Sequence, residues 1–171
     1  KKIPIVFLQD VTGFMVGKRS EHGGIIKDGA KMVNAVANST VPKITIITGN
    51  SYGAGNYAMC GKAYDPRFIF AWPTARIAVM GGSQAANTLL QIEVAAHEKR
   101  GEIVTEEKKK EFLKQLKDRY ERQTDVRYAA ARLWVDDIIH PESTRERISR
   151  AIEVADHNPD IPVFRTGVIQ V

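Results

Sequence analysis

The sequence predicts an α/β fold with a mostly parallel sheet, and a few local patterns carry this prediction. Residues 3–9 and 43–48 are short apolar runs rich in β-branched side chains, which is typical of strands buried on both faces. Between them, residues 25–37 place apolar side chains at helical spacing, and Val41 and Pro42 follow the end of this helix. A strand, a helix and a second strand in this order predict a unit whose strands run parallel.

The rest of the chain continues this alternation of strands and helices. A glycine-rich loop is expected at residues 10–24, a short helix at 54–60, strands at 67–73 and 76–80, a helix at 81–100, a helix starting at Val126, a strand at 135–139, an amphipathic helix at 141–158 and an extended tail from 159. Thr105 begins a strongly charged helix with a start typical of a capping motif. Its apolar residues form a narrow stripe, which favours packing on its own domain over packing on a partner, although a long helix with so little apolar surface could also project.

Composition limits the classes of function. The 171 residues are enough for one domain with a core, and much of the charge, in a chain with a net charge of +5, sits in the alternating-sign helix. No basic cluster is interleaved with aromatic residues, so a nucleic-acid partner is not expected, and no apolar run is long enough to span a membrane. The chain starts without Met inside a strand-like pattern, so we expect it to be part of a longer protein.

The usual catalytic side chains are hard to find. The single cysteine, Cys60, excludes a disulfide framework and is interpreted as a small buried apolar residue. Among the four histidines only His22, in the first glycine-rich loop, is kept as a neighbour of a site. Asp136 and Asp137 are adjacent on a predicted strand and point to opposite faces, so a structural role is favoured over a metal site.

Glycine-rich segments recur between strands and helices, at residues 13–24, 49–55 and 81–82. A helix that starts after such a segment presents free N–H groups, which suit either a phosphate or an oxyanion. A dinucleotide site is disfavoured, because GNSYGAG is not GxGxxG and residues 68–72 contain no acidic side chain. Any single segment could serve only as a tight turn, but three of them on one small sheet favour a functional cleft.

Long segments of the sequence resemble the carboxyltransferase subunits of biotin-dependent acyl-CoA carboxylases. They are FLQDVTGFMVGKRSEHGGIIKDGAKMV, VPKITIITGNSYGAGNYAMCGKAYDPRFIFAWPTARIAVMGG and QAAN, and their forms are most similar to the β subunit of methylcrotonyl-CoA carboxylase. The resemblance implies the crotonase (ClpP-like) superfamily fold, a spiral of ββα units. It also implies that residues 1–171 are the C-terminal, biotin-facing domain, and that an N-terminal acyl-CoA-binding domain lies outside this chain.

The same resemblance implies an activity, partners and a site. The activity is carboxyl transfer from carboxybiotin to an acyl-CoA, 3-methylcrotonyl-CoA, without a metal. The partners are a biotin carboxylase or biotin carboxyl carrier subunit, the protein's own N-terminal domain and neighbouring subunits in a hexamer, in the bacterial cytoplasm or the mitochondrial matrix. Backbone N–H groups of Ala54 and Gly55 would form an oxyanion hole, with Gly53 shaping the turn. Biotin-binding positions would be Phe14, Val16, Gly17, Gly23, Gly24, Tyr52, Gly81, Gly82 and Gln84.

Three alternatives remain open. The same site could run the transfer in reverse in an acyl-CoA decarboxylase, because the chemistry of the site works in both directions. Another acyl-CoA, such as propionyl-CoA, could be the substrate. Outside enzymology, the domain could serve only in assembly.

Overall fold

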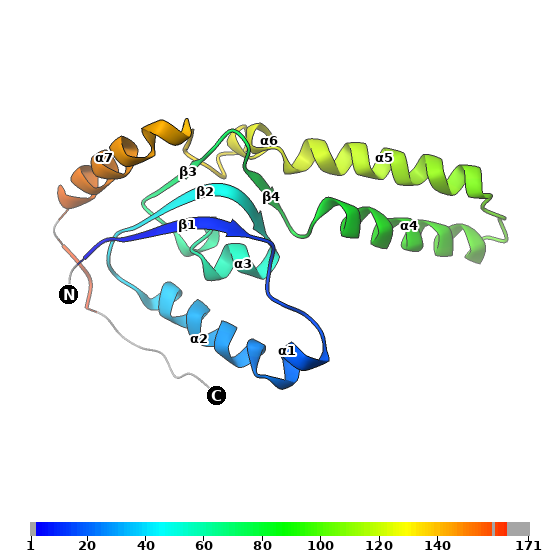
Figure 1. Ribbon diagram of the computed structural model, residues 1–171, viewed down its shortest axis with the longest axis horizontal. Coiled ribbons are helices and arrows are strands. Elements are labelled where there is room, and N and C mark those ends of the chain that lie inside the picture. The colour runs from blue at the N-terminus through cyan, green and yellow to red at the C-terminus, as the bar shows by residue number, and fades with distance from the viewer. Residues whose placement is uncertain (1–2, 159, 164–171) are drawn as a thin grey trace.

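The computed structural model describes residues 3–158 and 160–163, and it has the predicted α/β fold (Figure 1). Its strands are β1 (Ile5–Val11), β2 (Lys43–Tyr52), β3 (Phe68–Ala71), β4 (Arg76–Ala78) and β5 (Asp137–Ile138). They form one sheet in the order β1-β2-β3-β5, while β4 pairs with β2, and every pairing between these strands is parallel. The prediction of a mostly parallel sheet is confirmed.

Seven helices accompany these strands within the described residues, and the last of them follows β5. They are α1 (Lys18–His22), α2 (Ile25–Asn38), α3 (Gly53–Ala58), α4 (Gly82–Lys99), α5 (Glu106–Thr124), α6 (Val126–Ala130) and α7 (Thr144–Asp156). Short 3-10 turns lie at Lys62–Tyr64 and Pro141–Ser143. Helix α1 lies inside the segment predicted as a glycine-rich loop, so that prediction was incomplete. The extended tail falls mostly outside the described residues.

Strand β2 is the centre of the sheet because it pairs with three other strands. Its first half pairs with β3, from Ile44 to Ile47, and its last residues, Asn50–Tyr52, pair with β4. The strand predicted at residues 43–48 is therefore too short, because residues 49–52 also belong to β2. The pairing with β4 extends the strand past Gly49, so β2 reaches directly to the start of α3.

Strand β1 differs from its prediction as a strand buried on both faces. It lies at one end of the strand order, so among the described residues a strand pairs with only one of its edges. Leu8 is 57% exposed and Ile5 is 39% exposed, and only Gln9 in this strand is buried. The two buried apolar clusters draw their residues from the other parts of the fold. One surrounds Ile69 and Val126, and the other surrounds Ile46 and Ala151.

Helices α4 and α5 form a hairpin that projects from the sheet (Figure 1). Thr105 caps α5 as predicted, since its hydroxyl accepts a hydrogen bond from the backbone N–H of Lys108 at 3.4 Å. The apolar stripe of α5 faces α4, and the Phe112 ring stacks on His97 with centroids 5.5 Å apart. The stripe therefore packs within its own domain. Among the described residues, no helix has both the length and the apolar character that a membrane span requires.

Candidate active site

The start of α3 lies where β2 ends, beside the carboxyl end of β1 (Figure 1). Tyr52 is the N-cap residue, and no side chain caps the helix. The first N–H groups of an α-helix have no acceptor within the helix, so those of Ala54 and Gly55 can donate to another group. Ala54 is exposed, whereas Gly55 is buried. The structure thus places the two predicted N–H donors in one helical turn.

A side chain at Gly53 or Gly55 would collide with neighbouring atoms, so both positions need glycine. Gly53 has a φ of 53°, and a Cβ there would lie 2.8 Å from the carbonyl oxygen of Val79. At Gly55, a Cβ would lie 2.6 Å from a methyl group of Val11 and 3.2 Å from the Cα of Gly13. The two glycines therefore let the end of β1 and the loop after β4 close against the start of α3.

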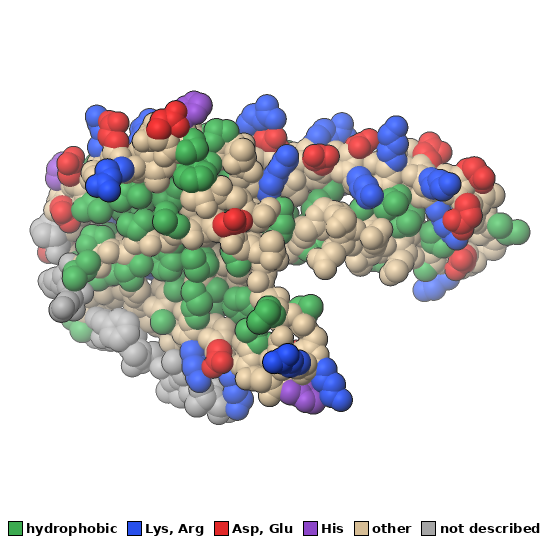
Figure 2. Space-filling model, viewed as in Figure 1, with side chains coloured by type: hydrophobic (Ala, Val, Ile, Leu, Met, Phe, Trp, Pro, Cys, Tyr) green, Lys and Arg blue, Asp and Glu red, His purple; other side chains and the backbone are tan. Residues whose placement is uncertain are grey.

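The other predicted glycines lie at helix ends in two projecting parts of the molecule. Helices α1 and α2 form one arm, and helices α4 and α5 form the other (Figure 1). Gly17 and Gly24 are the N-cap residues of α1 and α2, with φ values of 107° and 94°, and Gly23 is the C-cap of α1. Gly81 is the N-cap of α4, and Gly82 is its first residue. Figure 2 shows an open hollow between the α1–α2 arm and the α4–α5 arm.

Exposed apolar side chains occur in the loops that begin both arms. Met15 and Val16 precede α1, while Val79 and Met80 precede α4. Val16 is 85% exposed and Val79 is 77% exposed. Gln84 is exposed in the first turn of α4. The loops that begin the two arms therefore carry apolar side chains that are open to solvent, while the N–H groups of Ala54 and Gly55 lie at the start of α3.

Phe14 and Tyr52 are partly engaged elsewhere. The ring of Phe14 packs so closely on Gly29 of α2 that a Cβ at that glycine would collide with it. Tyr52 lines a cavity of about 310 Å³ together with Arg76 and Gly82, and burial raises the pKa of its hydroxyl. Both side chains are half-buried, and these contacts show that each of them packs against other parts of the domain.

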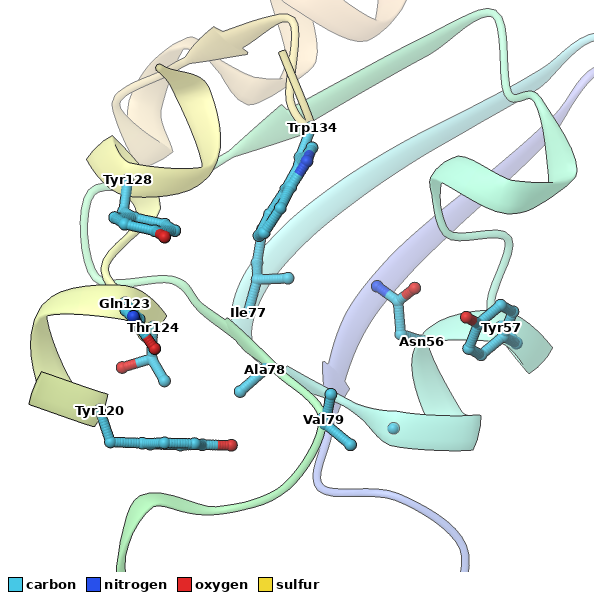
Figure 3. A pocket seen from close by; sticks show the side chains of 11 residues that line it. Asn56, Tyr57, Ile77, Ala78, Val79, Tyr120, Gln123, Thr124, Tyr128 and Trp134 are labelled. Carbon is cyan, nitrogen blue, oxygen red and sulfur yellow. The ribbon is translucent and has the colours of Figure 1, made fainter. Parts of the chain in front are cut away.

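A larger cavity of about 430 Å³ starts at Gly53 and extends between α3, β4 and α6 (Figure 3). Asn56 and Tyr57 line it from α3, and Ile77 and Val79 line it from β4 and the loop that follows. The side chains opposite α3 come from α5, α6 and the loop before β5: Tyr120, Gln123, Thr124, Tyr128 and Trp134. These five residues are not among the predicted site residues, because a tertiary contact, the antiparallel bridge between Arg76 of β4 and Asp125, brings the end of α5 and the start of α6 next to β4.

Three of the titratable candidates, Cys60, Asp136 and Asp137, have structural roles. Cys60 is fully buried, and burial raises the pKa of its thiol. Asp136 accepts a hydrogen bond from the backbone N–H of Ile69 at 2.7 Å, while Asp137 forms an ion pair with Arg147 at 3.4 Å. His22 is exposed at the end of α1. Within the described residues, no group of three or more His, Cys, Asp or Glu side chains could hold a metal ion.

Comparison with known families identifies the type of domain. Residues 1–168 match the model of the family described as "Carboxyl transferase domain". The chain belongs to this carboxyl transferase domain family. The domain is 55% identical over all 171 residues to the mitochondrial methylcrotonoyl-CoA carboxylase beta chain of Arabidopsis thaliana. It is 48% identical over 159 residues to the biotin-dependent 3-methylcrotonyl-coenzyme A carboxylase beta1 subunit of Mycobacterium tuberculosis.

Solved structures confirm the fold of this carboxyl transferase domain. The geranyl-CoA carboxylase beta subunit of P. aeruginosa matches 99% of the chain with a TM-score of 0.80 and 39% identity. The transcarboxylase 12S subunit, solved as a hexamer assembly with methylmalonyl-coenzyme A bound, matches 99% with a TM-score of 0.84 and 35% identity. The crotonase-type α/β fold is therefore confirmed. The chain spans 29% of the Arabidopsis relative and 30% of the M. tuberculosis relative.

Proposed function

We propose that this carboxyl transferase domain is the biotin-facing part of an enzyme that transfers a carboxyl group from carboxybiotin to 3-methylcrotonyl-CoA. The observation that carries this proposal is the 55% identity to the Arabidopsis methylcrotonoyl-CoA carboxylase beta chain over the whole domain. The identity is lower, at 41%, to a methylmalonyl-CoA carboxyltransferase 12S subunit. It is 38% to the alpha subunit of a methylmalonyl-CoA decarboxylase. The forward transfer to methylcrotonyl-CoA is thus favoured over the reverse reaction.

The residues at the start of α3 fit a biotin group. Its ureido oxygen can accept hydrogen bonds from the N–H groups of Ala54 and Gly55, which no side chain caps. The exposed apolar side chains of Val16, Val79 and Met80 suit the apolar parts of its fused sulfur-containing ring and its hydrocarbon chain. When bound, carboxybiotin supplies the carboxyl group for the transfer.

The chemistry assigned to the domain is electrostatic. Backbone N–H groups held in fixed directions stabilise an oxygen that gains negative charge during the reaction, and they need no reorganisation as the charge develops. Gly53 holds the turn in which these groups lie, because its positive φ and its contact with Val79 leave no room for a side chain. Phe14, Gly17, Gly23 and Gly24 position the arm that closes the hollow on one side.

The cavity beside Gly53 is assigned to the acyl group of the substrate. It begins next to the proposed N–H donors and is lined largely by apolar and aromatic side chains, including Tyr57, Ile77 and Trp134. Its volume of about 430 Å³ accommodates a small branched acyl group. The hydroxyl and amide groups on its wall can form hydrogen bonds that orient the thioester end of the substrate.

We further propose that the complete protein works with a biotin carboxylase or biotin carboxyl carrier subunit and forms a hexamer. The remaining part of the protein contributes the acyl-CoA-binding domain, which completes the active site from a neighbouring subunit. The relatives are a mitochondrial chain from Arabidopsis and a bacterial subunit from M. tuberculosis. Either the mitochondrial matrix or the bacterial cytoplasm is therefore the proposed compartment.

The test uses the full-length protein with its biotin-carrying partner. We expect carboxylation of 3-methylcrotonyl-CoA with a higher kcat/KM than of propionyl-CoA, and no turnover by the 171-residue chain alone. Gly55→Val is expected to abolish transfer, since its side chain would enter the contact with Val11 and displace the N–H donors. Full activity of Gly55→Val would favour the assembly role. A preference for propionyl-CoA would overturn the substrate assignment.

A further inference from the structure

A buried chain of hydrogen bonds joins β1, β2 and α3 directly behind the proposed N–H donors. The hydroxyl of Ser51 donates to Gln9 Oε1 at 2.6 Å and accepts from Asn56 Nδ2 at 2.7 Å. Gln9 Nε2 in turn donates to the carbonyl oxygen of Met59, the C-cap residue of α3, at 2.6 Å. Gln9 and Ser51 are both 0% exposed. The three side chains therefore connect two strands to both the middle and the end of α3.

A further hydrogen bond lies at the C-terminal end of α3. The hydroxyl of Thr45, which is also fully buried, donates to the carbonyl oxygen of Cys60 at 2.7 Å. The last carbonyl groups of a helix have no partner within it, so Gln9 and Thr45 satisfy acceptors that would otherwise be buried without a donor. Within the described residues, no buried side-chain nitrogen or oxygen atom lacks a partner.

The length of α3 makes these bonds important for its orientation. A helix of six residues has too few internal hydrogen bonds to be stable by itself, so contacts with its surroundings fix its direction. Ser51 lies three residues before Ala54, and Asn56 directly follows Gly55. The bonds of Ser51 and Asn56 thus hold the chain on both sides of the two N–H donors.

We propose that Gln9, Ser51 and Asn56 are positioning residues, which hold α3 so that the N–H groups of Ala54 and Gly55 keep a fixed direction. This inference rests on the proposed function, because it assigns those N–H groups to the reaction. Hydrogen bonds in a buried network are strong, and the network cannot rearrange without leaving a polar atom unpaired. A shift of the donors by about 1 Å lowers the rate of a transfer reaction by up to about a hundredfold.

The chain offers a matched control for the experiment. Thr48 also donates from its hydroxyl to Gln9, at 3.0 Å, but the acceptor is the backbone carbonyl oxygen and the bond does not involve α3. Ser51→Ala and Thr48→Val each remove one hydroxyl beside Gln9. Gln9→Met keeps the approximate volume of the side chain and removes both of its bonds, so it serves as a second test variant.

The variants are compared in the full-length protein by kinetics and by hydrogen–deuterium exchange. We expect Ser51→Ala and Gln9→Met to lower kcat by about tenfold or more with KM changed by less than about twofold, because the donors act on developing charge. Exchange of the amides at residues 54–59 should be faster in both. Thr48→Val should keep the kcat of the wild type and its exchange at residues 54–59, at a comparable melting temperature.

The outcomes separate this inference from the proposed function. If Ser51→Ala and Gln9→Met keep kcat within about twofold of Thr48→Val while the wild type is active, the positioning role is overturned and the proposed function stands. If the full-length wild type transfers no carboxyl group, the proposed function fails. In that case exchange still decides whether the network holds α3, and equal exchange in all variants overturns that as well.

Discussion

The hydroxyl of Tyr120 binds both backbone polar groups of Met80. It donates to the Met80 carbonyl oxygen at 2.7 Å and accepts from the Met80 N–H at 3.2 Å. Tyr120 belongs to α5, whereas Met80 lies in the loop that leads into α4. The preceding residue, Val79, contacts Gly53 at the start of α3. These two hydrogen bonds therefore connect the projecting hairpin to the wall of the candidate site.

Tyr120→Phe should loosen this connection. We expect a loss of about 1 kcal/mol in the free energy of unfolding, since the bonds are partly exposed and the ring is kept. Urea denaturation measures this loss. Proteolytic cleavage in the segment 79–82 should also become faster. Unchanged cleavage there, with an unchanged free energy of unfolding, would show that the hydroxyl does not hold the loop.

Gly29→Ala should destabilise the domain, although alanine is usually the better residue within a helix. In an unobstructed helix this substitution gains up to about 1 kcal/mol. Here the new methyl group would collide with the ring of Phe14 and force it off α2, which costs about 1–3 kcal/mol. Thermal unfolding measures the change, and Gly29→Ala combined with Phe14→Ala should recover part of it. An increase in melting temperature for the single variant would contradict the packing described here.

Asp125 should contribute stability that depends on pH. It caps α6 by accepting from the backbone N–H of Arg127 at 2.8 Å, and its other oxygen lies 2.7 Å from the Arg127 guanidinium. The hydrogen bonds from Arg127 lower the pKa of Asp125 from 3.8 to about 2. The folded state therefore binds this proton less tightly than the unfolded chain, so the contribution is complete above about pH 4 and is lost as pH falls towards 2.

Asp125→Asn separates the charge from the cap. The amide oxygen can still accept from the helix N–H, so the loss at neutral pH should be smaller than the loss of about 1 kcal/mol expected for Asp125→Ala. Urea denaturation between pH 2 and pH 7 provides the measurement. The difference between the wild type and Asp125→Asn should vanish at the acidic end. A difference that is constant across this range would rule out the role of ionised Asp125.

Cys60 should be inert in the native protein. Its thiol is fully buried, and burial raises its pKa, so little thiolate is present and a reagent cannot reach it. Iodoacetamide should modify Cys60 only after unfolding. Cys60→Ala, His22→Ala and His97→Ala should each leave carboxyl transfer by the full-length protein within about threefold of the wild type. A much larger loss from Cys60→Ala would reveal a catalytic side chain.

The local sequence was enough to predict the parallel sheet and the long helices. Apolar side chains at helical spacing identify α2, and Thr105 identifies the start of α5 because its hydroxyl accepts from a helix N–H. The position of α1 was missed, since this five-residue helix has no buried residue and therefore no apolar pattern. The exposure of β1 was missed because an apolar sequence does not specify whether both faces of a strand are covered.

The glycine-rich segment after β2 shows where sequence information ends. From the sequence alone, the segment predicts a helix start with free N–H groups. Only the tertiary structure decided that Val11 and Val79 pack closely against its glycines, and that Tyr120 and Trp134 line the cavity beside it. Backbone preferences depend on neighbouring residues, whereas the cavity is formed by segments about seventy residues apart, which the bridge between Arg76 of β4 and Asp125 helps to bring together.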